Sequence, residues 1–264
     1  MRRLGLLLLP LLVACGQTSA SSQVAPPEPV GALSAQEATA LLVALPQAAA
    51  QARSVSYDAV TESALDGEEP RVEAELSGVL DTTADAGTAD VALVALAELA
   101  AQAEAGGDAE AAQEMAALGQ VRLSWDADEL TLLMGGERVS GPRDDADSGM
   151  YARIPGEPAG LFEVVAAASD VAVMGSEAVD GVATTHLRGT AQPRAAVEAG
   201  LGTQAQLAIA QLPDLPVEVW VDGQGRPARI RYTVTLPSLQ EGRTRSLVTT
   251  YDYRGWGEPV DVTP

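Results

Sequence analysis

The sequence contains no lysine, one cysteine, one histidine and one phenylalanine among its 264 residues. Its 16 basic residues are therefore all arginines, and they face 37 acidic residues, which gives a formal net charge of −21. Binding to nucleic acid needs a basic surface that neutralises phosphates, so the charge argues against a nucleic-acid partner. A single cysteine excludes an internal disulfide, and a single histidine leaves little for metal chemistry.

Aromatic residues are also scarce, at 3% of the chain, whereas apolar residues reach 47%. This apolar content is enough to build a core and argues against global disorder. The core must then consist mainly of leucine, valine and alanine. The length suits one large domain or two small ones, and we find no internal repeat and no linker that would divide the chain.

The N-terminus carries the pattern of an export signal. Two arginines are followed by an apolar run of eleven residues, 4–14, which is too short to span a bilayer but suits a signal peptide. The run ends in Leu-Val-Ala before Cys15, the chain's only cysteine. This ending resembles the bacterial lipobox, whose cysteine is alkylated by diacylglycerol and then acylated, for example with palmitate. The alternative is an ordinary signal peptide with an incidental cysteine.

These signals predict three segments. Residues 1–14 are a lipoprotein signal peptide, residues 15–33 are a Ser-, Ala- and Pro-rich flexible tether, and residues 34–264 are the folded domain. No later segment has the length and hydropathy of a transmembrane helix. We therefore expect a protein on the extracytoplasmic face of the cell membrane, held there by its acyl chains alone.

Helical patterns occur in four places. Ser34 and Glu37 form a capping-box pattern before a helix that extends to residue 52, and Pro46 should kink or divide it. The apolar face of this helix is predicted to contain Ala38, Leu41, Leu45, Ala48 and Ala52. Residues 96–118 are rich in Ala and Glu and read as a helical hairpin or a mobile insert. A short apolar segment, 161–168, and residues 193–212 complete the predicted helices.

Between the helices, residues alternate between apolar and polar, as in half-buried strands. The alternation is clear at 72–80, at 121–126 with 130–134, at 217–222 with 229–236, and near 245–253. A Gly-Gln-Gly turn at 223–225 separates two of these segments and predicts a hairpin. One apolar face per strand indicates an antiparallel sheet with one face exposed to solvent.

Three motifs in the second half of the chain resemble those of a known family. They are the segment DGVATTHLRGT at 180–190, the segment LPVEVWVD at 215–222, and the end YDYRGWGEPV at 251–260. Together with the lipobox and the order of the elements, they make the chain similar to the actinobacterial LppX/LprG-type lipoproteins (LppX_LprAFG). The resemblance covers residues 180 to the C-terminus best and is architectural before that. The chain departs from the family at Leu187, where an aromatic residue is common, and at the 96–118 insert.

The resemblance implies an α+β, LolA-like fold, in which helices cover the concave face of a strongly curved antiparallel sheet, an unclosed half barrel. It also implies an apolar cavity for lipid acyl chains, and a role in carrying lipid or lipoglycan across the cell envelope, with a membrane lipid exporter as a possible partner. No catalysis and no cofactor are implied. We expect the cavity to be lined by Leu76, Leu123, Leu132, Leu161, Phe162 and Val219.

A second hypothesis concerns arginines. Residues 226–254 contain six arginines and two acids, a net charge of +4 in a chain that is otherwise strongly acidic. Arg229 and Arg231 share one face of a strand and could meet an anionic lipid head group. The alternative is an ordinary solvated sheet face, on which nearby carboxylates offset these arginines.

Enzyme and metal functions have little support. There is no G-x-S-x-G elbow, no P-loop and no G-x-G-x-x-G motif. His186 would have to serve any Ser-His-Asp triad, and it has no nucleophile motif beside it. Asp145, Asp147 and Gly149 resemble the start of a calcium loop, but Gly156 stands where the twelfth-position Glu belongs. A lipid carrier is the main hypothesis, and an envelope scaffold or sensor with a packed interior is the alternative.

Overall fold

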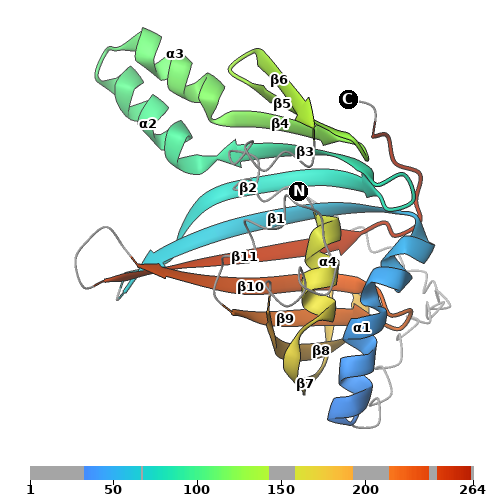
Figure 1. The fold of residues 1–264 in the computed structure, drawn as a ribbon. Helices are drawn as coiled ribbons and strands as arrows, with labels where there is room; N and C mark the ends of the chain where they lie inside the picture. The colour runs from blue at the N-terminus through green and yellow to red at the C-terminus, as the bar shows by residue number, and fades with distance from the viewer. Residues whose placement is uncertain (1–32, 67, 143–157, 193–213, 238–242, 263–264) are drawn as a thin grey trace, which may run out of the picture.

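The computed structural model describes residues 33–66, 68–142, 158–192, 214–237 and 243–262. These residues form four helices and eleven strands (Figure 1). In chain order they are α1 (Ala35–Ala52), β1 (Ser54–Leu65), β2 (Arg71–Asp81), β3 (Ala86–Leu93), α2 (Val94–Ala105), α3 (Ala109–Leu118), β4 (Gln120–Trp125), β5 (Glu129–Met134), β6 (Glu137–Pro142), α4 (Pro158–Ala166), β7 (Ser169–Val179), β8 (Val182–Ala191), β9 (Leu215–Asp222), β10 (Pro227–Pro237) and β11 (Thr244–Arg254).

All eleven strands belong to one antiparallel sheet in the order β6-β5-β4-β3-β2-β1-β11-β10-β9-β8-β7. Each half of the chain forms a meander, and the two meanders meet where β1 pairs with β11. Tyr57 lies opposite Tyr253 in this pairing, and Ala59 lies opposite Tyr251. The sheet is strongly curved and does not close, because β6 and β7 remain its two edges in the described part (Figure 1). The predicted α+β fold, with a strongly curved antiparallel sheet that does not close, is thereby confirmed.

Helix α1 begins with the predicted capping box. The Ser34 hydroxyl accepts a hydrogen bond from the Glu37 backbone N–H, and the Glu37 carboxylate accepts one from the Ser34 backbone N–H. The helix runs through Pro46 undivided, so of the two predicted effects of this proline only a kink remains. The buried face is also shifted by one position from the predicted one at two sites, and it consists of Ala38, Leu42, Leu45 and Ala49.

Most other predicted elements are present, but several strands were missed. The 96–118 segment is a helical hairpin, α2–α3, which connects β3 to β4, and the predicted hairpins β4–β5 and β9–β10 form. The alternation did not indicate β1 and β3, where Ser, Thr, Asp and Ala interrupt the apolar positions, or the edge strands β6 and β7. The predicted helix at 193–212 and the polar loop at 140–149 lie wholly or largely outside the described residues.

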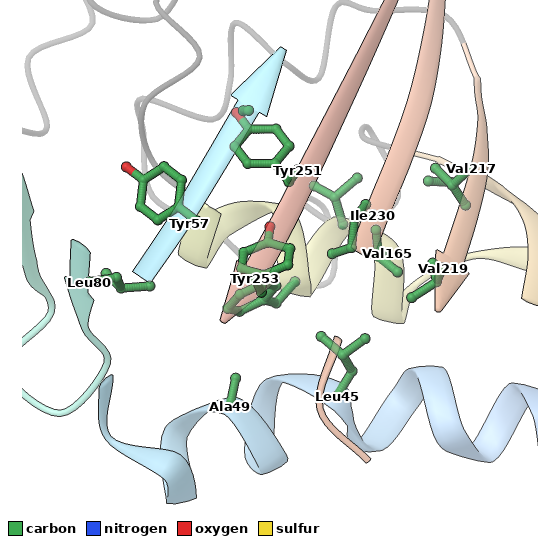
Figure 2. Close-up of a cluster of buried hydrophobic side chains, with 14 of the residues drawn as sticks. Leu45, Ala49, Tyr57, Leu80, Val165, Val217, Val219, Ile230, Tyr251 and Tyr253 are labelled. Atoms are coloured by element: carbon green, nitrogen blue, oxygen red, sulfur yellow. The ribbon is translucent and has the colours of Figure 1, made fainter. Parts of the chain in front are cut away.

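The core lies between the sheet and the two helices α1 and α4. Helix α1 packs against α4, β1 and β7, and α4 also contacts β8. Figure 2 shows Leu45 and Ala49 of α1 facing side chains of the strands, with Val165 of α4 among them. The buried apolar cluster is continuous from these helices across the sheet to Leu132 of β5. The helices therefore cover one face of the sheet, which we call the inner face, and leave the opposite, outer face to solvent.

Candidate functional site: the inner face of the sheet

Strand alternation separates the two faces along each strand. In β10, Ile230 is fully buried on the inner face, whereas its neighbours Arg229 and Arg231 point outward. In β11, Tyr251 and Tyr253 are buried, while Asp252 between them belongs to the outer face. Neighbouring residues of one strand therefore contribute alternately to an apolar inner face and a charged outer face.

Aromatic rings gather at the middle of the inner face, although the chain has few of them. Tyr253 lies 5.4 Å from Phe162 of α4 and 6.0 Å from Trp256, measured between ring centroids. Tyr251 and Tyr57 lie 6.1 Å and 6.4 Å from the Tyr253 ring (Figure 2). Burial raises the pKa of Tyr251 and of Tyr253 well above the usual range, so both hydroxyls keep their protons at neutral pH.

Two glycines allow further rings to lie flat on the sheet. A Cβ atom at Gly78 would stand 2.6 Å from the Tyr57 ring, and one at Gly87 would stand 2.3 Å from the Trp125 ring. Both glycines are therefore needed for close approach, since any side chain would displace a ring. The rings of Tyr57 and Trp125 cover the inner face where β2 and β3 pair.

The interior contains no charged residue in the described part of the chain. The buried polar residues there are all Ser or Thr: Ser54, Ser63, Ser124, Thr131, Thr184 and Thr249. Two buried polar atoms of the inner face, Trp125 Nε1 and Tyr253 Oη, have no hydrogen-bond partner among the described residues. An unpaired buried donor costs about 1–3 kcal/mol, so both atoms are notable in an otherwise apolar cluster.

The six residues predicted to line a cavity all lie in or against this inner cluster. Leu161 is partly buried, and the other five are at most 4% exposed: Leu76, Leu123, Leu132, Phe162 and Val219. Leu123 and Leu132 are direct cross-strand partners, whereas Phe162 and Leu161 approach from α4. The structure thus brings the six to one side of the sheet. That they line a cavity stays a prediction.

A groove among the described residues lies on the other face of the sheet. It has a volume of about 360 Å³ and is flanked by Asp58, Glu75, Ser77 and Asp90. These side chains alternate with buried Ala59, Leu76 and Val91, so the groove lies on the outer face and its floor is the backbone. Leu76 therefore takes part in this groove through its main chain, with its side chain on the opposite face.

At the far end of the inner face lies a polar group that the sequence analysis did not single out. Arg245 pairs with Glu73 at 2.8 Å, and Glu73 also accepts a hydrogen bond from the Ser63 hydroxyl. Arg245 has the same parity in β11 as Leu247 and Tyr251, which places it on the inner face. The alternation of residues along β11 is the sequence signal that could have identified Arg245 as an inner-face residue.

The two arginines predicted to meet a head group lie on the outer face. Arg229 pairs with Asp252 at 2.5 Å, and Arg231 lies 3.5 Å from Glu218. The other four arginines of the 226–254 segment also have acidic partners: Asp222 for Arg226, Glu68 for Arg243, Glu73 for Arg245 and Asp58 for Arg254. The head-group role stays a prediction. The observed pairing is what the alternative, a solvated face offset by carboxylates, requires.

His186 forms part of the same outer face. Its ring stacks on Trp220 at 4.2 Å, and its Nδ1 lies 3.2 Å from Glu177, which also accepts a hydrogen bond from Trp220 Nε1. Burial lowers the pKa of His186, against the opposing influence of Glu218 and Glu177. The hydrogen bond from Arg188 lowers the pKa of Glu218, although burial acts the other way. These contacts join β7, β8 and β9, and they indicate a structural role for His186.

The described residues contain neither a metal-binding cluster nor a membrane-spanning helix. No group of three or more His, Cys, Asp or Glu side chains there is arranged to hold a metal ion. No helix in that part of the chain combines the length and hydropathy of a membrane span. Cys15, Asp145 and Asp147 lie outside the described residues.

Comparisons with known proteins agree with this architecture. Residues 148–262 match the family model "LppX_LprAFG lipoprotein". The structure is similar to that of lipoprotein LppX from Mycobacterium tuberculosis, with a TM-score of 0.51 and 15% sequence identity over 87% of this chain and 100% of that one. It is also similar to LprF from Mycobacterium bovis, with a TM-score of 0.49 and 15% identity over 89% and 99% of the two chains.

A LolA superfamily protein from Nitrosomonas europaea is a more distant structural match, with a TM-score of 0.28 and 11% identity over 85% of this chain and 95% of that one. No curated protein matches the sequence. The similarity in structure concerns the fold. The similarity to the lipoprotein family rests on the match to residues 148–262.

Proposed function

We propose, from the match of residues 148–262 to the LppX_LprAFG lipoprotein family model, that this chain binds lipid acyl chains against the inner face of its sheet. In this proposal the protein carries lipid or lipoglycan across the cell envelope and hands it to, or receives it from, a membrane partner. Cys15 anchors it by a diacylglyceryl group to the extracytoplasmic face of the cell membrane. Residues 15–33 are then the tether that lets residues 34–264 reach a neighbouring membrane.

The observation that carries the proposal is the continuous buried apolar cluster of the inner face, which contains no charged residue in the described part of the chain. Acyl chains need an environment without charge, because their transfer from water is driven by burial of apolar area at about 25 cal/mol per Å². In the described residues the inner face offers such a surface from β5 to β8, whereas the outer face is covered with ion pairs. The outer groove, flanked by Asp58, Glu75 and Asp90, is poorly suited to hydrocarbon.

The composition of the inner cluster adds support. It includes small residues at positions where larger ones would fill space, such as Ala49 and Ala59, and the rings of Tyr57 and Trp125 lie over glycines. Small side chains on facing elements leave room that a ligand can share. Aromatic rings have flat apolar surfaces against which acyl chains can pack.

A second candidate function has an observation in its favour. Most of the described interior is one continuous buried cluster that joins α1 and α4 to the strands, and only Val179, Trp220 and Ala228 form a second, small cluster. A fully packed interior would leave the protein as a lipid-anchored scaffold or sensor, with no ligand of its own. The two functions differ in one measurable property, which is the presence of lipid in the folded protein.

The experiment uses the full chain carrying Cys15→Ser, which removes the proposed lipidation site. The purified protein is analysed by native mass spectrometry before and after delipidation, and again after exposure to dioleoylglycerol in detergent micelles. Acyl lipid bound at about one molecule per chain supports the carrier. A clean mass for the unliganded chain, with no uptake after delipidation, supports the scaffold.

A further inference from the structure

The acidic residues are concentrated in one half of the sheet. Residues 54–142, which form β1–β6, α2 and α3, contain 19 acidic residues and three arginines, a net charge of −16. The described residues that form α4 and β7–β11 contain ten acidic residues and seven arginines, a net charge of −3. Helix α1 and its flanking residues, 33–53, add one acid and one arginine. Most of the negative charge therefore lies on one side of the β1–β11 junction.

The α2–α3 hairpin lies at the acidic end of the molecule. It has no basic residue and five exposed acidic ones, Glu98, Glu104, Asp108, Glu110 and Glu114. The hairpin contacts β2 and β4, and Figure 1 shows it at the opposite end of the molecule from β7. The 11 strands of the sheet, spaced about 4.8 Å apart, extend over about 50 Å along its curve. The two ends are thus separated by several Debye lengths, each about 8 Å at physiological salt.

The predicted tether joins the fold at the other end. The structure describes the chain from residue 33, and α1 follows at once and packs against β7 and α4. Figure 1 shows the start of α1, in the darkest blue, at the end of the molecule where β7 and β8 lie. The 19 residues 15–33 reach at most about 65 Å when fully extended, so an anchor at Cys15 holds this end within that distance of the lipid.

We propose that the anchored domain is oriented by charge, with α1, β7 and β8 facing the membrane and the α2–α3 hairpin turned away from it. The surface that it faces is a bilayer containing anionic lipid, which repels a half with a charge of −16 far more than one with −3. This inference rests on the proposed anchoring at Cys15 and adds to it the side of the molecule that the membrane meets. Val43 of α1 and Met174 of β7 are exposed apolar side chains on that side.

The test measures the height of two labels above a bilayer. The full chain, with p-azidophenylalanine in place of Met174 or Leu99, is purified from the membranes of a bacterial host and reconstituted on phosphatidylcholine vesicles with about 30% phosphatidylglycerol. Both side chains are 45% exposed, so the two positions are matched. Energy transfer from a fluorophore coupled to the azide to acceptor lipids gives each height. We expect the label at 174 to lie closer to the lipid than the label at 99, by about 20 Å or more.

Lipid charge and salt then show whether repulsion sets the orientation. The difference in height should fall by about half or more on vesicles of phosphatidylcholine alone, and also at about 1 M salt, where the Debye length is about 3 Å. Both measurements use chains without a charge substitution, so they do not depend on how such variants fold. Equal heights on the anionic vesicles, or a difference that is the same on neutral ones, would overturn the inference.

Two double variants with the same change in net charge separate the two ends. Glu98→Gln with Glu104→Gln removes acids from the hairpin and should reduce the difference in height. Asp170→Asn with Asp180→Asn is the matched control at β7 and the β7–β8 turn, where both residues have a positive φ that asparagine tolerates. This control should preserve the difference or increase it. The same reduction in both variants would contradict an orientation set by the position of the charges.

The intact mass of the purified chain distinguishes this inference from the anchor on which it rests. A mass that includes diacylglyceryl and acyl groups on Cys15 supports the anchor. An unmodified Cys15 would overturn the proposed anchor, and its free thiol would then be coupled to a maleimide-bearing lipid on the same vesicles. The heights of the two labels would still be measured with the chain attached at residue 15, and they would support or overturn the orientation in the same way.

Discussion

The two faces of this sheet are built from alternating residues of the same strands, yet they handle polar groups in opposite ways. On the outer face, Arg229, Arg231 and Arg254 each have a carboxylate within ion-pair distance. On the inner face, charge is absent among the buried described residues. Trp125 Nε1 and Tyr253 Oη there, like His186 Nε2 on the outer face, have no hydrogen-bond partner among the described residues.

The comparison distinguishes residues that interact only with one another from residues that are suited to binding a ligand. A surface whose charges are mutually satisfied gains little from a further ligand, because an incoming ion must displace a partner that is already present. A surface that is apolar, with a few unpaired donors, gains both burial and hydrogen bonds when a suitable molecule arrives. We therefore expect substitutions on the inner face to affect folding or lipid binding, and those on the outer face to affect neither strongly.

The largest effect should come from removing an inner-face side chain of α1. Leu45 is fully buried, and Leu45→Ala should lower the free energy of unfolding by about 3 kcal/mol, because it leaves a cavity between the helix and the sheet. Val43 on the same helix is 61% exposed, and Val43→Ala should change the free energy of unfolding by less than about 0.5 kcal/mol. Urea denaturation of both variants measures the difference, and equal effects would contradict the assignment of the faces.

A somewhat smaller effect should follow from adding a methyl group under a ring. Gly78→Ala places a Cβ 2.5 Å from the Thr88 carbonyl oxygen and 2.6 Å from the Tyr57 ring, so we expect a loss of about 2 kcal/mol. A Cβ atom at Gly141 in β6 would meet no atom within 4 Å, so Gly141→Ala is the matched control. If thermal unfolding of Gly78→Ala resembled that of the control, the ring would not lie where we describe it.

Removal of the outer-face arginines tests the head-group hypothesis directly. The double variant Arg229→Gln, Arg231→Gln should lose about 1 kcal/mol or less for each pair, because side chains that are a third to a half exposed are well screened. Lipid occupancy, measured by native mass spectrometry as above, should not change. A clear loss of bound lipid would show instead that these arginines contact the ligand.

The smallest effect concerns pH and the outer face. Burial lowers the pKa of His186 below its usual value of 6.5, so the folded state favours the neutral ring. Stability from this residue is therefore present above pH 6.5 and is lost as the pH falls through the folded-state pKa. Because the chain has one histidine, His186→Asn should remove much of any decrease in melting temperature between pH 7.5 and pH 5.5. An identical decrease in the variant would assign it to the carboxylates.

Alternation in the sequence was sufficient to find β2, the β4–β5 and β9–β10 hairpins and β11, because their apolar residues recur at every second position. It failed for β1 and β3, since Ser, Thr and Ala serve there as inner-face residues beside Tyr57 and Val91. It also failed to fix the buried face of α1, because Leu41 and Leu42 are both apolar and the sheet decides between them.

For the candidate site, the sequence identified inner-face residues such as Leu123 and Phe162 but not their setting. It could not show that Trp125 and Tyr253 are unpaired, because pairing depends on strands that are distant in the chain. It also could not show that Arg229 lies against Asp252, which requires the register of β10 with β11. Cross-strand register is set by the whole sheet and not by local sequence.

The most direct test of lipid binding is whether the folded protein contains lipid. Native mass spectrometry of the Cys15→Ser chain, purified from a bacterial host and then reloaded with dioleoylglycerol after delipidation, measures whether the inner face accepts acyl chains. We expect about one bound lipid per chain in both samples. A protein that remains free of lipid in both samples would contradict this expectation.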